Sequence, residues 1–224
     1  MQRSELPPGQ RELGFFPRYG LFQYADRIER TPAPLRLLID GAVGNHLVLD
    51  AQALSVLPRV AQASDLHCIT SWSQRELAWS GYRFKDFYAQ IVVPQAAPDP
   101  GVRYIVLHAR DRYRTYFLLE DALADEVLLA DQLEGAALNW EHGAPLRVVA
   151  PAHYGFRSAK HLSRIEFCRD LKRYRSPAMH WTEHPRARVA CEERGRFLPG
   201  WIYRYLFRAV IPLVLWWYRR AAPR

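Results

Sequence analysis

The most informative stretch of this chain is Asp65-Leu66-His67-Cys68-Ile69-Thr70-Ser71-Trp72-Ser73. It continues to Trp79-Ser80-Gly81-Tyr82. It places one cysteine among a histidine, small hydroxyl residues and tryptophans. A thiolate binds transition metals well, and its neighbours decide whether it is a ligand, a nucleophile or inert. Because free cysteine is among the most buried residue types, Cys68 taken alone is interpreted as a structural thiol at the end of a strand.

The composition is that of a folded globular protein. The chain has 224 residues, 49% of them apolar and 24% charged, which suits one large domain or one domain with appendages. Its three cysteines, Cys68, Cys168 and Cys191, are widely spaced and odd in number, so they indicate no disulfide framework and favour a reducing compartment. No two of them form a CxxC pair, which argues against a zinc finger or ribbon.

Positive charge is concentrated near the C-terminus. Residues 170–224 contain twelve Lys/Arg and four Asp/Glu, a surplus of eight that equals the net charge of +8, so residues 1–169 balance to zero. A basic, aromatic tail favours a membrane surface or an acidic partner, and no nucleic-acid partner is expected. The N-terminus shows neither an apolar signal segment nor twin arginines, so we expect a cytoplasmic protein or one peripheral to the inner membrane.

The pattern of residues predicts an α+β fold in four segments. These are an N-terminal arm (1–34), a domain (35–169), a basic loop segment (170–196) and an apolar, basic C-terminal helix (197–224). Short β-prone runs separated by turn residues predict a mixed sheet with functional sites on loops. Strands are expected at 35–41, 47–49, 60–69, 102–108, 114–118, 127–130, 146–151 and 165–168. Short helices are expected at 51–54, at 120–123 and from residue 84 to before the linker at 94–101, with a turn or helix at 158–165.

A second informative region runs from Glu141 to Lys160. It holds Arg147, Arg157 and Lys160, and the last of these is one of only three lysines in the chain. Glycines in the same region allow the backbone to approach a ligand closely, and arginine offers a forked donor for phosphate. Spacing alone leaves a phosphate-binding loop and a solvated turn equally open.

The two regions together are more specific than either alone. His-Cys-Ile-Thr-Ser-Trp-Ser, Trp-Ser-Gly-Tyr, His-Gly-Ala-Pro-Leu-Arg-Val-Val-Ala-Pro and Tyr-Gly-Phe-Arg-Ser-Ala-Lys follow one another in this order. In this the chain resembles the molybdopterin-binding oxidoreductase domain of the sulfite oxidase superfamily. The likeness is to its small, haem-free bacterial members, including relatives of the methionine sulfoxide reductase catalytic subunit, and it covers residues 35–169.

The resemblance implies Mo-molybdopterin as the cofactor and gives roles to particular positions. Cys68 matches the cysteine whose thiolate binds molybdenum. His142 and Arg147 match the residues that hold the pterin and its phosphate. The segment Ser158, Ala159 and Lys160 matches the stretch that grips the same cofactor, the first two through backbone groups. Soft thiolate for the metal and cationic groups for phosphate agree with the chemistry of these ligands.

Tyr154 and Arg157 are proposed as catalytic residues, and with Ser71 they are the candidates that shape the substrate pocket. Arg157 lies next to the Ser158–Lys160 segment, so it could face either the phosphate or the substrate. Ser71 departs from the glycine that members of the superfamily often have, and Ala109 stands where a polar or glycine contact is usual. Arg18–Tyr24 is the best candidate for an N-terminal cofactor contact. Too few residues follow 169 for the dimerisation domain of true sulfite oxidases, which weakens sulfite as the substrate.

The C-terminal segment reads as an amphipathic helix that contains Pro212. Its uninterrupted apolar core, Ala209–Tyr218, has ten residues, whereas a spanning helix needs ~20. Arginines with terminal tryptophans and tyrosines favour a helix at a membrane interface or one that docks on a membrane electron-transfer partner. A helix packed on its own domain, or in a dimer seam, is the alternative.

Two functions of different classes follow. The first is a molybdenum-dependent oxidoreductase that transfers an oxygen atom, with two electrons, to or from a small sulfoxide- or sulfite-like substrate. It would exchange electrons with an external carrier such as a membrane cytochrome, because the sequence has no haem or iron–sulfur motif. The second is a non-catalytic molybdopterin-binding subunit docked to a membrane redox complex. A zinc or thiol enzyme would leave the Glu141–Lys160 region unexplained.

Overall fold

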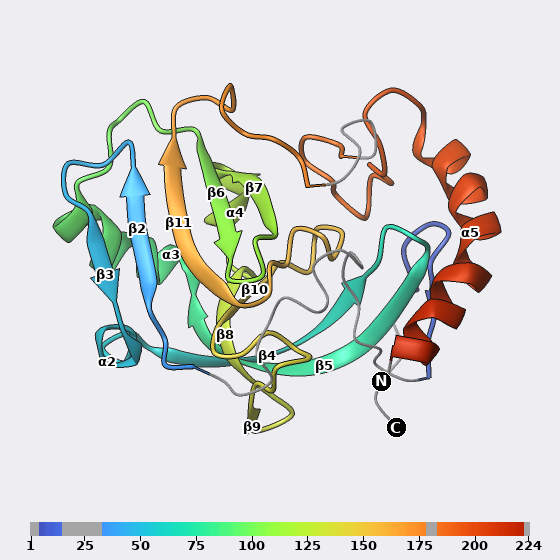
Figure 1. Cartoon of the computed structure of the whole chain (residues 1–224), viewed down its shortest axis with the longest axis horizontal. Helices are drawn as coiled ribbons and strands as arrows, with labels where there is room; N and C mark the ends of the chain where they lie inside the picture. The colour runs from blue at the N-terminus through green and yellow to red at the C-terminus, as the bar shows by residue number, and fades with distance from the viewer. Residues whose placement is uncertain (1–4, 15–32, 178–182, 222–224) are drawn as a thin grey trace.

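Two mixed β-sheets form the body of the protein. The computed structural model describes residues 5–14, 33–177 and 183–221 (Figure 1). The first sheet has the order β1-β5-β8-β10, with β4 paired to β5 and β9 to β8, and the second has the order β3-β2-β11-β6-β7. The strands of the first sheet are β1 (Arg11–Glu12), β4 (Arg59–His67), β5 (Trp72–Arg83), β8 (Leu128–Leu133), β9 (Ala136–Ala137) and β10 (Arg147–Val149). Those of the second are β2 (Leu37–Gly41), β3 (Leu47–Leu49), β6 (Tyr104–Ala109), β7 (Arg114–Leu118) and β11 (Leu162–Cys168).

The second sheet is completed by β11, which lies between two strands from much earlier in the chain. It pairs parallel with β2 and antiparallel with β6, so that Ile165 is opposite both Ile39 and Leu107. All three side chains are fully buried. Because neighbouring strands bring side chains of one face into register, these residues form a continuous apolar row. The expected turn or helix at 158–165 therefore ends earlier than predicted, because Leu162 already belongs to β11.

The first sheet is built on the β4–β5 hairpin, which delivers Cys68 to its loop. β5 crosses β8 so closely at Gly81 that a Cβ there would lie 2.1 Å from the carbonyl oxygen of Leu129. Only glycine is compatible with that approach. The short strand β1 pairs parallel with the start of β5, at Trp72 and Ser73, and so places the N-terminal segment beside the loop.

The helices are short except for the last. They are α2 (Ala51–Leu54), α3 (Phe84–Phe87), the π-helix η1 (Tyr88–Ala96), α4 (Leu119–Ala122) and α5 (Gly200–Ala221). The predicted cap of α2 is confirmed, since Asp50 accepts a hydrogen bond of 2.9 Å from the Ala53 N–H. The prediction that the helix from residue 84 ends before Pro94 is wrong, because η1 contains it. The wider π turn moves the carbonyl four residues back away from the proline ring.

The main hydrophobic core lies between the sheets and the α3–η1 segment, with Phe87, Val92 and Phe167 among its fully buried members. A smaller cluster lies on the β4–β5 hairpin and includes Trp72, Trp79 and Ala144. α5 stands at one side of the molecule, away from the second sheet (Figure 1). In the part of the chain that the structure describes, no helix is long and apolar enough to cross a bilayer.

Candidate functional site

Cys68 lies at the tip of the β4–β5 hairpin, in a loop whose backbone is closed by two hydrogen bonds. The Cys68 N–H donates to the Trp72 carbonyl over 2.8 Å, and the Ser71 N–H donates to the Cys68 carbonyl over 3.1 Å. Ser71 has φ +74°, so the loop is a three-residue turn that ends in a left-handed residue. Glycine adopts this conformation at least cost, so the serine at this position is strained.

A chain of polar side chains supports this turn. Gln10 donates from Nε2 to the Cys68 carbonyl over 3.1 Å and accepts from Ser73 Oγ over 3.0 Å. Ser73 Oγ is 2.8 Å from His67 Nδ1, and because the hydroxyl proton is used on Gln10, the imidazole must be the donor. Burial lowers the pKa of His67, so the ring is neutral at pH 7. The turn is thus fixed by a segment almost sixty residues earlier in the chain.

Arg194 holds the turn from the other end of the chain. Its guanidinium, fully buried, donates to the carbonyls of Ile69 and Pro8 and to Glu192, over 3.1 Å to Pro8 and 3.2 Å to Glu192. Glu192 in turn accepts from Arg204 of α5. The first and last parts of the chain therefore meet beneath the loop that carries Cys68.

The environment of the Cys68 thiol acts on its ionisation in both directions. The side chain is partly buried, and burial raises its pKa. A hydrogen bond with Thr70, Sγ to Oγ1 3.1 Å, and the positive charge of Arg194 lower it. A thiolate here gains from a bound cation, because the metal charge adds to that of the arginine.

The second region forms a loop in which two cations point at backbone oxygens. Lys160 Nζ donates to the Glu141 carbonyl over 2.7 Å, and Arg147 donates to the His142 and Ser158 carbonyls over 2.9 and 3.3 Å. Burial lowers the pKa of His142 to about 4, and the charges of Lys160 and Arg147 add to this effect. The loop thus brings two cationic side chains close to a neutral imidazole.

Gly143 allows this arrangement. It has φ +110°, and a Cβ there would lie 3.0 Å from the Cβ of Lys160 and 3.2 Å from that of Arg147. An L-residue is strained at this φ whatever the space. The peptide bond between Ala144 and Pro145, which follow Gly143 in the loop, is cis.

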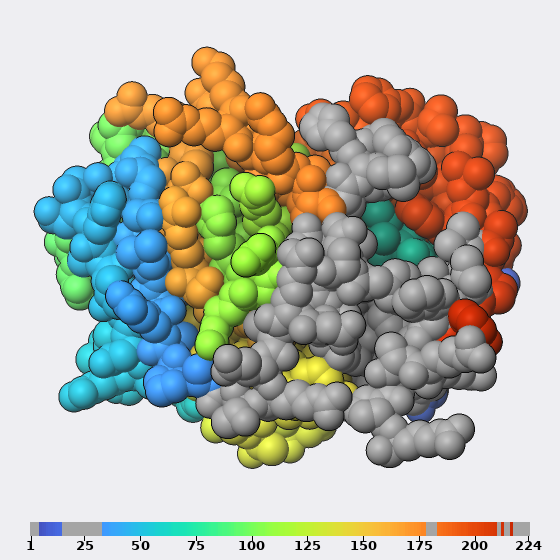
Figure 2. All heavy atoms as spheres, viewed as in Figure 1, coloured from blue at the N-terminus to red at the C-terminus, as the bar shows by residue number. Residues whose placement is uncertain are grey.

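The thiol and the cationic loop are brought to the same part of the molecule. The Gly155 N–H donates to the His67 carbonyl over 2.7 Å, which joins the segment before Ser158 to the residue before Cys68. The Arg147 guanidinium stacks on Trp79, 4.7 Å from its ring, in the cluster against which Cys68 also packs. In Figure 2 atoms in the teal of the β4–β5 hairpin are visible beside the orange-red C-terminal segment.

Ser158 and Ala159 act through their main chains as well as by position. The Ser158 carbonyl accepts a hydrogen bond from the Arg147 guanidinium, and the Ser158 Oγ accepts one from the Ala150 N–H over 3.2 Å. The Ala159 carbonyl accepts a hydrogen bond from the Val148 N–H over 2.9 Å. Both residues are buried. They hold β10 and the Lys160 segment in fixed relative positions.

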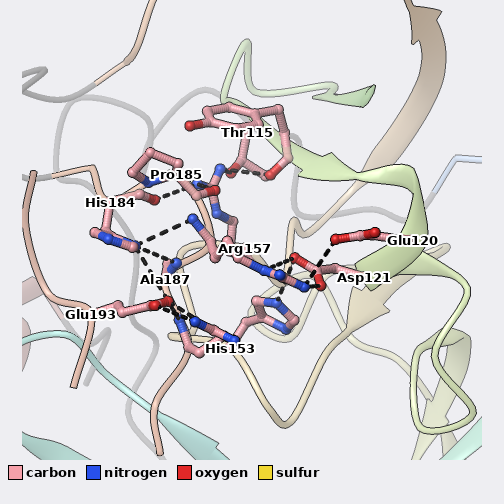
Figure 3. Close-up of polar contacts among 12 residues, drawn as sticks. Thr115, Glu120, Asp121, His153, Arg157, His184, Pro185, Ala187 and Glu193 are labelled. Atoms are coloured by element: carbon pink, nitrogen blue, oxygen red, sulfur yellow. Dashed lines mark hydrogen bonds and ion pairs between the residues drawn. The ribbon is translucent and has the colours of Figure 1, made fainter. Parts of the chain in front are cut away.

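Tyr154 and Arg157, expected on the substrate side, are both fully buried. The Tyr154 ring lies under Arg194, 5.1 Å from the guanidinium, and burial raises the pKa of its hydroxyl to about 12. Arg157 donates to Thr115 over 3.1 Å and to the carbonyls of His184 and Pro185 over 2.8 and 2.9 Å (Figure 3). It also pairs with buried Glu183 at 3.1 Å. In this structure Arg157 fastens the segment after residue 183 to β7.

Gln10, Ser73, Glu192 and Arg194 are the site residues that the sequence analysis did not single out. Gln10, Glu192 and Arg194 act on the Cys68 turn across a long sequence separation, so no local spacing marks them, whereas Ser73 lies in the same stretch as Cys68. A Pro-Pro-Gly turn before Gln10 is the one local signal, because it fixes the approach of that side chain. The Arg18–Tyr24 candidate lies outside the described residues.

The residues present fit a phosphate-bearing metal cofactor. One thiol suits a transition metal, and a cationic loop with a glycine cradle suits a phosphate. Among the described residues there is no group of three or more His, Cys, Asp or Glu that could hold a metal by protein ligands alone. Fold and site thus define a class of α+β redox protein in which a cofactor supplies most of the metal's ligands.

Comparison with known proteins identifies the family. A model of the oxidoreductase molybdopterin binding domain matches residues 25–174, so the chain belongs to this family. The uncharacterized oxidoreductase YuiH of Bacillus subtilis (strain 168) is 32% identical over 171 residues, which are 75% of this chain and 82% of that protein. The protein-methionine-sulfoxide reductase catalytic subunit MsrP of Burkholderia mallei is 30% identical over 149 residues, 61% of this chain but 44% of MsrP.

A solved structure agrees with the fold. The sulfane dehydrogenase SoxCD from Paracoccus pantotrophus superposes with a TM-score of 0.56 at 21% identity, over 72% of this chain and 44% of that one. The expected α+β fold of sulfite-oxidase type and the expected family are confirmed. The chain is an oxidoreductase, and molybdopterin is the cofactor that its domain binds.

Proposed function

We propose that the protein is a molybdenum-dependent enzyme that transfers an oxygen atom, with two electrons, to or from a small sulfoxide- or sulfite-like substrate. The observation that carries the proposal is the Cys68 turn, held by buried Arg194 and joined through Gly155 to the cationic loop of Arg147 and Lys160. One thiol and one phosphate site are what a single molybdopterin requires of the protein. When bound, this cofactor supplies the two-electron and oxygen-transfer chemistry, while the protein holds and orients it.

Each site residue then has a defined task. Cys68 would be the protein ligand of molybdenum, and Lys160, which is half-buried, would contact the phosphate. Arg147 is fully buried over Trp79, so it would serve the cofactor through its charge and through the His142 and Ser158 carbonyls that it holds. His142, neutral at pH 7 because of its low pKa, exchanges hydrogen bonds with the pterin without adding charge. Ser158 and Ala159 present main-chain groups from the turn that Arg147 fixes.

Tyr154 and Arg157 act in this proposal as positioning residues. Both are fully buried, so their effect on the substrate passes through what they hold. Tyr154 packs against the arginine that supports the Cys68 turn, and Arg157 orders the segment after residue 183. The electrons come from, or go to, an external carrier such as a membrane cytochrome, because the sequence carries no haem or iron–sulfur motif.

Metal analysis of protein made in a host that synthesises molybdopterin tests the proposal. Wild-type protein should contain molybdenum near one atom per chain, and Cys68→Ala should lose oxygen-transfer turnover and most of the metal. Cys168→Ala is the matched control, because this thiol is also partly buried but ends β11 in the other sheet. Equal metal loss in both variants would contradict the role of Cys68.

The substrate is found by assaying molybdenum-loaded protein with sulfoxides and a reduced dye, and with sulfite and an oxidised dye. Turnover in either direction that disappears in Cys68→Ala supports the enzyme. Bound cofactor without turnover in any of these assays would overturn catalysis and leave a cofactor-binding subunit.

A further inference from the structure

α5 presents an exposed aromatic stripe that the oxidoreductase site does not use. Trp201, Tyr205, Ala209, Pro212 and Trp216 follow at intervals of four, four, three and four residues, which places them on one face of a helix. All five are exposed, with 55% of Trp201, 60% of Tyr205 and 48% of Trp216 accessible to solvent. Phe197 and Leu198, which precede Pro199 and the helix, are also exposed, at 71% and 46%. Single exposed apolar residues are ordinary, but a contiguous row of this length marks an interaction surface.

The opposite side of α5 is fixed to the domain, so the stripe cannot rotate inward. Tyr203 is 1% exposed and packs so closely on Gly195 that a Cβ there would lie 2.1 Å from its ring. Arg204 pairs with Glu192, which also holds Arg194 beneath the Cys68 turn. The face that carries the stripe is therefore turned to solvent by the packing of the other face.

The positive charge near the stripe indicates that its partner is an anionic surface. From residue 200 to residue 224 the chain has five arginines and no lysine, aspartate or glutamate, and one of the five, Arg204, pairs with Glu192. Arg208 is exposed beside the stripe, 6.0 Å from the Tyr205 ring. Two copies of α5 packed face to face would bring these like charges together, which costs free energy, whereas an anionic surface gains from them.

The shape of the stripe fits a flat surface along its whole length. From Trp201 to Trp216 the helix rises by fifteen steps, which correspond to about 22 Å at 1.5 Å per residue. Pro212 has no N–H, so the carbonyl of Arg208 cannot receive its helical hydrogen bond and needs water or a headgroup. Tryptophan and tyrosine prefer the boundary between headgroups and acyl chains, where such groups are present.

We propose that α5 binds the surface of an anionic phospholipid bilayer, lying in the headgroup region with Trp201, Tyr205 and Trp216 buried at the acyl boundary and Arg208 facing lipid phosphates. The coupling through Glu192 then orients the Cys68 side of the domain relative to the membrane. This surface is separate from the oxygen-transfer chemistry, and its test does not depend on turnover.

Flotation of molybdenum-loaded full chain with vesicles tests the proposal. The protein should float with vesicles of phosphatidylglycerol and phosphatidylcholine and stay behind with pure phosphatidylcholine, and added salt should release it. Substituting alanine for Trp201, Tyr205 and Trp216 together should lower the partition coefficient by on the order of a hundredfold. Val56→Ala with Val93→Ala is the matched control, since these apolar residues are 73% and 46% exposed on another part of the surface.

Charge reversal tests the electrostatic part separately. Arg208→Glu should lower binding to anionic vesicles about 30-fold, because each charge near such a surface contributes about fivefold. Arg173→Glu, at another exposed arginine, should have little effect. Molybdenum content and the far-ultraviolet circular dichroism spectrum show whether each variant is folded.

Three results would overturn the proposal. One is absence of flotation with anionic vesicles, and a second is flotation that the triple alanine variant retains. The third is a wild-type dimer in analytical ultracentrifugation that the triple variant abolishes, without vesicle binding, which would assign the stripe to a second copy of this chain.

Discussion

Replacing Arg194 with methionine tests how the Cys68 turn is held. Methionine keeps much of the apolar stem but removes the hydrogen bonds to the Ile69 and Pro8 carbonyls and to Glu192. Hydrogen bonds of charged groups contribute about 1.5–3 kcal/mol each, and breaking a buried ion pair costs about 3–5 kcal/mol. Glu192 retains Arg204 as a partner, so we expect a loss of about 3–4 kcal/mol in the free energy of unfolding.

Replacing Arg194 with methionine should also change the pKa of the Cys68 thiol. Because the charge of Arg194 lowers the pKa of Cys68, its removal should raise that pKa. In cofactor-free protein the midpoint of the pH profile for iodoacetamide alkylation of Cys68 should therefore move to higher pH. Cys168→Ala and Cys191→Ala in the same background restrict the signal to one thiol.

Urea unfolding followed by tryptophan fluorescence gives the stability change, and Arg188→Met is the matched control. Arg188 also pairs with a carboxylate of the same segment, Glu193, but its side chain is 40% exposed, so we expect a change of about 0–1 kcal/mol. The reasoning is refuted if Arg194→Met and Arg188→Met destabilise equally, or if the alkylation midpoint does not move.

Three further predictions concern the cationic loop and the polar network. Gly143→Ala should cost about 1–3 kcal/mol in melting experiments and lower molybdenum content, whereas Gly135→Ala, at φ +77° with open space, should keep that content; equal metal loss in both would contradict the cradle. The low folded-state pKa of His142, about 4 against 6.5, means that the unfolded chain takes up its proton first as the pH falls, so stability present above pH 6.5 is lost towards pH 4. His142→Asn should therefore reduce the loss of unfolding free energy in cofactor-free protein between pH 7 and 5 by about 1–2 kcal/mol, and an unchanged pH dependence would contradict the low pKa. Arg157→Met should destabilise by about 3–5 kcal/mol and expose residues 183–187 to limited proteolysis; lost turnover with unchanged stability and proteolysis would instead place this arginine at the substrate.

Local patterns accounted for most of the short strands. The roles predicted for Cys68, Arg147 and Lys160 came from the order of several compact motifs and the family that this order resembles, and they stay predictions. The α2 helix and its Asp50 cap followed from capping chemistry that involves only neighbouring residues. These are features that a few consecutive residues determine.

The strand β5 and the support of the Cys68 turn could not be predicted in the same way. In β5 the alternation is broken at Glu76, which has φ +52° and donates its N–H to Asp65 over 2.9 Å. Such a bulge interrupts the two-residue period on which strand prediction depends. Gln10 and Arg194 act on Cys68 only after the chain has folded, so their importance is a property of tertiary structure.

The hydrogen bond between Arg194 and Pro8 joins residues 186 positions apart, and it has a consequence for the order of events during synthesis. At about 5–20 residues per second, the ribosome adds Arg194 roughly 6–25 s after Cys68. During that interval Cys68 has been synthesised, but Arg194, which supports its turn, has not. Cofactor delivered to a nascent chain would meet an unsupported cysteine, so we expect productive loading to begin only after the segment that contains Arg194 has left the ribosome.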